Sequence, residues 1–235
     1  MTSATGTSGV ARAHRVAIVT TAVGPERELG RVSGAQQRFL DVIGGFDDSD
    51  LRRPSLLPGW TVAHVLVHVA RNADSHRRRT EAAARGDVID QYPGGSEGRA
   101  AEIERGVART RAEILDDVVS SADGMQTAWR QVSDGAWDVI SRDVSGKERP
   151  LRSLPARRWQ ELEVHVVDVD ADVTHRDWSA DFVEVWLPAL RASAEPRLPG
   201  GAALPAPGTL DDRDELAWLY GRLQRRDLPE LTPWG

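Results

Sequence analysis

Between Arg157 and Asp172, polar and apolar residues recur at helical spacing. The pattern predicts a helix with a polar stripe that lies inside the protein. At 100° per residue, five polar side chains fall within an arc of about 80° on such a helix. Apolar residues flank this arc on both sides, whereas a solvated stripe normally lies opposite the apolar face. We therefore expect the stripe to point into the fold. Its members are Arg158, Glu161, His165, Asp168 and Asp172.

Two further long helices are predicted from apolar residues that recur at helical spacing. One covers residues 25–43. The other covers residues 61–85, with Thr61 as its N-cap and Gly86 as its stop. The segment between them, residues 47–60, contains two prolines and is predicted to be a loop.

A third helix, of about 25–35 residues, is predicted to begin at Ser96 and to end near Gly135. The Gly- and charge-rich residues 134–155 are predicted as loops, with Trp137 anchored in the core. The stripe helix follows Pro155. Four long helices predict a mainly α fold, an antiparallel four-helix bundle.

The predicted bundle occupies residues 25–177 and is flanked by two different segments. Residues 1–24 are rich in Ser, Thr, Gly and Ala and are expected to be a flexible tail. Residues 178–235 are expected to form a short C-terminal domain with helices near 181–190 and 215–223. Asp211 or Asp212 can cap the last helix. A unit this small is not expected to be stable without the bundle.

Composition narrows the classes of partner. The 235 residues carry a formal net charge of −6, so nothing electrostatic favours nucleic acid or an anionic membrane. No apolar run approaches the roughly 20 residues that span a bilayer. The chain has no cysteine, which excludes disulfides, thiolate metal ligands and a protein thiol nucleophile. These properties fit a cytoplasmic protein that acts on a small molecule.

A metal ion is one possible partner for the buried stripe. Glu161 and His165 stand at i, i+4, and His68 lies at the edge of the apolar face of the second helix. Two imidazoles and one carboxylate without a fourth protein ligand are typical of a catalytic zinc site with an open position. His64 is disfavoured because it lies further from the apolar face. The alternative is a network of buried salt bridges involving Arg158.

Five blocks of the sequence carry a family resemblance. They are LPGWTVAHVLVHVARNAD, YPGGSEGRAAEIERG, RRWQELEVHVVDVD, LAWLYGR and the closing LPELTPWG. Together they resemble the mycothiol-dependent maleylpyruvate isomerase family, whose bundle is of the DinB type. The resemblance covers most of residues 26–235 and implies a DinB-like bundle with a small C-terminal α/β appendage. The family's C-terminal domain is usually longer than the segment here.

The resemblance also implies roles for particular residues. It assigns His68, Glu161 and His165 to zinc, and places Arg99, Asp168 and Arg222 at the pocket for substrate and thiol. The implied cofactors are Zn²⁺ or another divalent metal, and mycothiol.

The implied reaction converts maleylpyruvate to fumarylpyruvate in the gentisate branch of aromatic degradation. A thiolate that adds to the cis double bond permits rotation, and elimination then returns the thiol. Because the chain has no cysteine, the thiol must come from outside. Arg99 and Arg222 would hold the carboxylates of the substrate, for which the guanidinium fork is suited. Asp168 would orient a zinc-bound histidine or polar groups of the thiol.

Two other functions remain open at this level. A DinB-like mycothiol-dependent S-transferase would use the same metal site to attack an electrophile and would leave the thiol in its product. A non-catalytic metal-binding regulatory bundle would need no pocket beside the metal. Small bundles of this type are compatible with a monomer.

Overall fold

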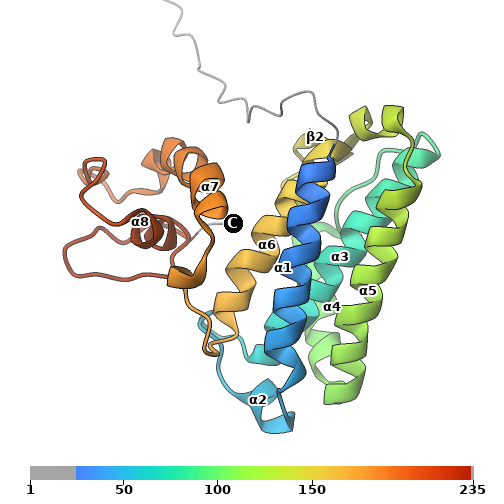
Figure 1. Ribbon diagram of the computed structural model, residues 1–235, viewed down its shortest axis with the longest axis horizontal. Coiled ribbons are helices and arrows are strands. Elements are labelled where there is room, and N and C mark those ends of the chain that lie inside the picture. The colour runs from blue at the N-terminus through green and yellow to red at the C-terminus, as the bar shows by residue number, and fades with distance from the viewer. Residues whose placement is uncertain (1–24, 234–235) are drawn as a thin grey trace, which may run out of the picture.

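The structure is a computed structural model that describes residues 25–233. Four long helices form a bundle, with α2, α4 and a small sheet at its ends and edge (Figure 1). The four are α1 (Glu26–Gly44), α3 (Val62–Ala84), α5 (Arg111–Gln131) and α6 (Leu154–Asp168). The mainly α fold class is thus confirmed, and the expected flexible tail of residues 1–24 lies outside the described residues.

The bounds of three predicted helices agree closely with the structure. α1 begins one residue after Pro25, and α3 has Thr61 at its N-cap. The stripe helix, α6, ends four residues earlier than expected, at Asp168. Asp170 adopts φ +50°, a left-handed conformation that ends a right-handed helix. Asp172 therefore lies outside the helix and is exposed.

The predicted third helix is two helices. α4 spans Gly95–Val107 and α5 begins at Arg111. Thr110 starts α5 through a capping box, in which its side chain accepts from the backbone N–H of Glu113 and Glu113 reaches back to Thr110. Ser96 is not the N-cap of α4; that position belongs to Gly94, whose φ of +75° is readily adopted by glycine.

The extra helix sets the direction of the bundle helices. Arg31 and Arg38 of α1 contact Trp159 and Glu163 of α6 in that order, so α1 and α6 run parallel. α3 and α5 are parallel as well, because Arg71 and His76 meet Asp117 and Trp129. In the sequence, α4 connects α3 to α5, and it brings the chain back to the end of the bundle where α3 begins. The bundle consists of two parallel pairs that run antiparallel to each other.

Two predicted loops contain regular structure. The segment 47–60 includes α2 (Asp48–Arg52), which Asp47 caps. Residues 134–155 include an antiparallel pair, β1 (Ile140–Arg142) and β2 (Glu148–Pro150), joined by a turn that the Asp143 side chain stabilises. The strands are too short for an alternating pattern to be visible. Trp137 is buried, as expected. Short 3₁₀ helices are η1 (Asp134–Asp138), η2 (Leu151–Ser153), η3 (His175–Asp177) and η4 (Glu195–Arg197).

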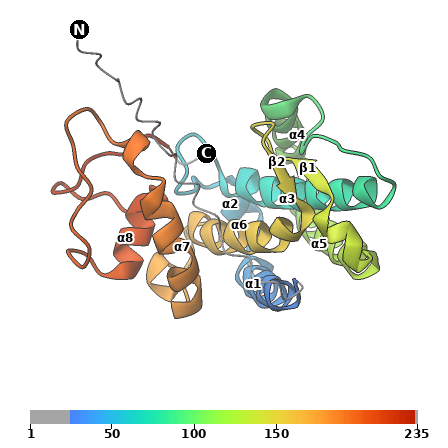
Figure 2. The same ribbon diagram turned by 90° about the horizontal axis from the view of Figure 1, so that it is seen from above.

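The C-terminal segment lies beside α6 (Figure 2). Its helices are α7 (Ala180–Ala192) and α8 (Asp212–Leu219), close to those predicted, and Asp211 is the cap of α8. Among the described residues from 178 onward there is no strand, so the expected α/β character of the appendage is not found there. The Pro/Gly-rich residues 197–208 lack the period-two pattern that a strand requires. A domain boundary at residue 177 stays a prediction.

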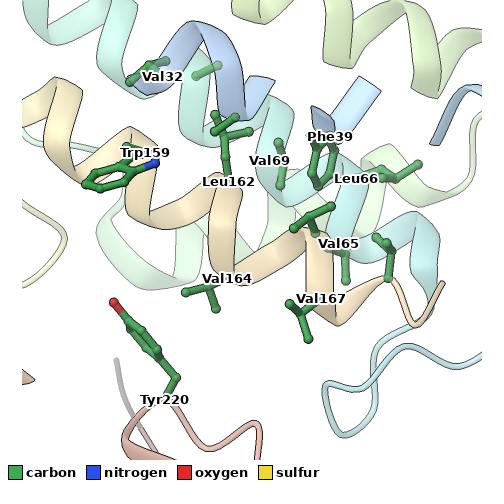
Figure 3. Close-up of a cluster of buried hydrophobic side chains, with 14 of the residues drawn as sticks. Val32, Phe39, Val65, Leu66, Val69, Trp159, Leu162, Val164, Val167 and Tyr220 are labelled. Carbon is green, nitrogen blue, oxygen red and sulfur yellow. The ribbon is translucent and has the colours of Figure 1, made fainter. Parts of the chain in front are cut away.

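The core joins the bundle to this segment. Valine, leucine and aromatic side chains of α1, α3 and α6 pack together, and Tyr220 extends from the C-terminal segment towards α6 (Figure 3). The Tyr220 hydroxyl accepts from Gln160 Nε2 at 2.8 Å. Trp178 donates from Nε1 to the carbonyl oxygen of Glu163 at 2.7 Å. α6 is thus covered by α1 on one side and by the C-terminal segment on another. Within residues 25–233 no helix is long and apolar enough to cross a membrane.

Candidate metal centre and cavity

Three side chains from α3 and α6 converge inside the bundle: His68, Glu161 and His165. One potential ligand atom from each lies within 4.8 Å of the others. Glu161 Oε2 is 3.0 Å from His68 Nε2 and 3.3 Å from His165 Nε2. The antiparallel crossing of α3 and α6 produces this meeting, because it brings the second turn of α3 level with the C-terminal half of α6. The structure therefore brings His68 of α3 together with Glu161 and His165 of α6.

Asp168 and Arg99 contact the two imidazoles from outside the cluster and fix their orientation. His165 Nδ1 is 2.7 Å from Asp168 Oδ2, and Asp168 is fully buried. A carboxylate accepts only, so Nδ1 of His165 donates to Asp168, and Nε2 is the ring atom that faces Glu161. His68 Nδ1 accepts from Arg99 Nη2 at 3.1 Å. The family resemblance implied that both Asp168 and Arg99 lie at the pocket for substrate and thiol.

The charges of the cluster depend on burial and on these contacts. Burial lowers the pKa of His68 to about 4, although the Glu161 carboxylate opposes the shift. Burial alone would raise the pKa of Glu161, but hydrogen bonds from His165 and His68 hold it well below its usual value. The pKa of His165 is raised because hydrogen bonds to Asp168 and Glu161 outweigh its burial. The structure thus combines an ionised carboxylate with a neutral imidazole at His68.

This donor set fits a divalent cation such as zinc. Two imidazole nitrogens and one carboxylate oxygen are ordinary zinc ligands, and three protein ligands leave one position for a further molecule. Among the residues that the structure describes, this is the one His/Asp/Glu group with such spacing. His64 is not part of it: its Nδ1 accepts from the backbone N–H of Thr61 at the start of α3.

The salt-bridge alternative required a carboxylate partner for Arg158. The side chain is fully buried, but its hydrogen bonds go to neutral oxygens of Val69, Asn72 and Gln36. It fastens α6 to α3 and α1 and takes no direct part in the cluster. Asp172 is too far along the chain to join it. Glu161 therefore has the imidazoles of His68 and His165 as its hydrogen-bond partners, and not Arg158.

A cavity of about 1080 Å³ opens beside the three residues. α3, α4, α6, the β1–β2 turn and the segment after α8 all line it. Arg99 lies between two aromatic walls, with its guanidinium carbon 6.0 Å from the Trp60 ring centre and 5.9 Å from that of Tyr92. The sequence argument did not single out Trp60 or Tyr92, although both stand within the quoted blocks. The cavity gives a small molecule room to reach the cluster.

Arg222 reaches the same region from the C-terminal segment. It donates from Nε and Nη2 to Asp168, at 2.8 and 2.6 Å, and from Nη1 to the carbonyl oxygen of Tyr220 at 2.6 Å. The arginine placed here by resemblance is therefore at the pocket, and its hydrogen bonds connect the appendage to the residue that orients His165.

Fold and site together define a class of protein: a four-helix bundle with a His/Glu/His cluster facing a cavity. The family model described as "Mycothiol maleylpyruvate isomerase N-terminal domain" matches residues 32–170, more than half of the chain. The chain belongs to this family. No curated protein matches its sequence.

Solved structures show the same fold. A crystal structure of the mycothiol-dependent maleylpyruvate isomerase is similar with a TM-score of 0.78 at 21% identity, covering 90% of this chain and 98% of that one. A histidine-to-alanine mutant of the mycothiol-dependent maleylpyruvate isomerase gives 0.77 at 20% identity, with the same coverage. YfiT from Bacillus subtilis, described as a probable metal-dependent hydrolase with an unusual four-helix bundle topology, gives 0.51 at 15%, covering 62% and 83%. The expected shortening of the C-terminal domain is not found relative to the first of these, since nearly all of that chain is covered.

Proposed function

We propose that this protein is a metal- and mycothiol-dependent cis–trans isomerase that converts maleylpyruvate to fumarylpyruvate. Three things support the proposal: membership of the family, the likeness of fold to the isomerase, and a three-ligand cluster that faces a cavity. The observation that carries it is the cluster with its cavity, because a purely structural metal site is closed by protein ligands. The bound metal and mycothiol would together supply a thiolate at neutral pH, the nucleophile that this cysteine-free chain lacks.

The residues of the protein would hold the metal and keep its ligands in the right orientation. His68, Glu161 and His165 are the proposed ligands, with His165 kept in the correct tautomer by Asp168. Asp168 is in turn fixed by Arg222. These residues keep the donor atoms in place before any ligand arrives, so that little reorganisation is needed.

Arg99 is the proposed holder of a substrate carboxylate. Arginine only donates, so its present hydrogen bond requires His68 Nδ1 to accept. A histidine that coordinates through Nε2 carries its proton on Nδ1, and it then has no acceptor to offer Arg99. Ligation therefore frees the guanidinium for the cavity, where a carboxylate can accept two parallel hydrogen bonds.

Product analysis tests the reaction. Metal-loaded protein is incubated with maleylpyruvate and a small amount of mycothiol, and the mixture is followed by NMR. We expect fumarylpyruvate as the product and free mycothiol at its starting concentration. A stable thioether that consumes one thiol per product would favour the S-transferase instead. Absence of any reaction under metal-loaded conditions would favour the regulatory bundle.

A further inference from the structure

Arg222 is already paired with a buried carboxylate inside the protein, and each of its three nitrogens donates a hydrogen bond. Its Nε and Nη2 atoms bind both oxygens of Asp168, and Nη1 binds the Tyr220 carbonyl. Asp168 has no exposure, so removing its partner would leave a buried carboxylate with much less compensation. Arg222 is therefore poorly suited to hold a substrate carboxylate. A dianionic substrate held by Arg99 at one end needs a different cation at the other.

Arg157 lines the cavity and, unlike Arg222, has no carboxylate partner among residues 25–233. It lines the same cavity and precedes Glu161 by four residues on α6, a spacing that puts side chains about 5–6 Å apart at Cβ. Its one hydrogen bond runs from Nη1 to Gln160 Oε1 at 3.2 Å, a neutral acceptor. Within residues 25–233, Nε and Nη2 of Arg157 have no hydrogen-bond partner and no carboxylate lies within ion-pair distance.

The surroundings hold Arg157 in place while leaving its charge unpaired. Its guanidinium carbon lies 5.7 Å from the ring centre of Trp186 of α7. Gln160, which accepts from Arg157, donates to the Tyr220 hydroxyl and is thereby fixed itself. Arg149 of β2 lines the same cavity but already donates to Asp143 Oδ2 at 2.6 Å. A half-buried, positioned cation without a counterion is what an incoming carboxylate requires.

We propose that Arg157 is the second carboxylate receptor of the cavity, so that Arg99 and Arg157 hold the two ends of a dicarboxylate whose middle lies beside the His68–Glu161–His165 cluster. The proposal rests on the proposed function and names how its substrate is recognised. It implies selection for short dicarboxylates over monocarboxylates of the same length. Arg222 then acts as a positioning residue through Asp168.

Binding without turnover tests this assignment. Metal-loaded protein without thiol is titrated calorimetrically with maleate, a cis-dicarboxylate, and with isocrotonate, its matched monocarboxylate. We expect Arg157→Gln to weaken maleate binding roughly tenfold to a hundredfold, the range for a lost hydrogen bond to a charged group, and to leave isocrotonate within about twofold. Arg157→Lys keeps the charge without the fork and should fall between the two.

Arg149→Gln is the matched control, because it removes the same charge from the same cavity wall. We expect it to change maleate affinity by no more than about twofold, since Asp143 already occupies that guanidinium. Equal losses in both variants would overturn the assignment and indicate a general positive potential. Unchanged maleate affinity in Arg157→Gln, with circular dichroism showing a folded bundle, would overturn it as well.

Steady-state kinetics distinguish failure of this inference from failure of the proposed isomerase function. If the enzyme isomerises maleylpyruvate, Arg157→Gln should raise KM for that substrate by a similar factor and change kcat less. If the protein is an active isomerase and Arg157→Gln leaves KM unchanged, the inference is contradicted and the proposed function is retained. Arg157-dependent maleate binding in a protein without isomerase activity supports the dicarboxylate site and rejects the reaction.

Discussion

Arg222 binds Asp168 through two parallel hydrogen bonds, Nε to Oδ1 at 2.8 Å and Nη2 to Oδ2 at 2.6 Å, across 54 residues of sequence. Asp168 also accepts from His165 Nδ1 at 2.7 Å. A continuous line of contacts therefore runs from the C-terminal segment to a proposed metal ligand. This relationship links stability to function, and it is the basis of the first two predictions.

Arg222→Gln should destabilise the protein by about 3 kcal/mol, because it leaves the buried Asp168 carboxylate without its cation. Chemical denaturation measures the free energy of unfolding. The double variant Arg222→Gln with Asp168→Asn should recover part of this loss, since it removes the uncompensated charge. If the single variant has wild-type stability, the bidentate pair contributes nothing to the fold.

Asp168→Asn should weaken zinc binding by about 10- to 100-fold while the bundle stays folded, because an amide orients the His165 ring less well than a carboxylate. Competition with a chromophoric chelator gives the affinity. Asp172→Asn is the control, since Asp172 is exposed and lies beyond the end of α6. Equal effects of the two substitutions would exclude a specific role for Asp168.

Trp178→Ala should destabilise the protein by about 3–5 kcal/mol, the range for removing a large buried aromatic side chain. Trp178 is 1% exposed, packs against Phe182 and Tyr220, and binds the Glu163 carbonyl. We expect a single unfolding transition at lower denaturant concentration. Two separate transitions in the wild type would show instead that the appendage and the bundle unfold independently.

Gly98→Ala should disturb the pocket through α4. A Cβ at this position would lie 1.8 Å from the carbonyl oxygen of Pro93, so Pro93 and the first turn of α4 must separate. Arg99, the next residue on that turn, is expected to be displaced. We expect kcat/KM to fall about tenfold or more, a change of at least 1.4 kcal/mol, with zinc content unchanged. Gly34→Ala is the control, because that helical glycine has nothing within 4 Å and alanine favours helix. Loss of zinc in Gly98→Ala would contradict a role limited to Arg99.

Much of the bundle could be read from sequence because its helices carry strong apolar periodicity. The polar stripe between apolar flanks correctly indicated that Glu161, His165 and Asp168 point inward. The break in the third helix was harder to see, since residues 108–110 contain neither proline nor glycine. The pattern Thr110–x–x–Glu113 was the available signal, a capping box in the middle of a continuous helical pattern.

The identity of the buried partners could not be predicted from periodicity. Arg158 lies on the predicted stripe, yet tertiary contacts give it neutral acceptors from α1 and α3. Its neighbour Arg157 lines the cavity instead, and the i, i+4 spacing of Arg157 to Glu161 is the signal that could have indicated this. The engagement of Arg222 with Asp168 depends on how the C-terminal segment packs, which no local pattern specifies.

The central claim is that a metal on the His68–Glu161–His165 cluster and an external thiol act together on maleylpyruvate. The most direct measurement is the initial rate of maleylpyruvate isomerisation by metal-loaded wild type and His68→Ala, each with and without mycothiol. We predict a rate above background only for wild type with mycothiol, with His68→Ala folded but depleted of metal. Full activity without mycothiol, or in metal-free His68→Ala, would contradict the claim.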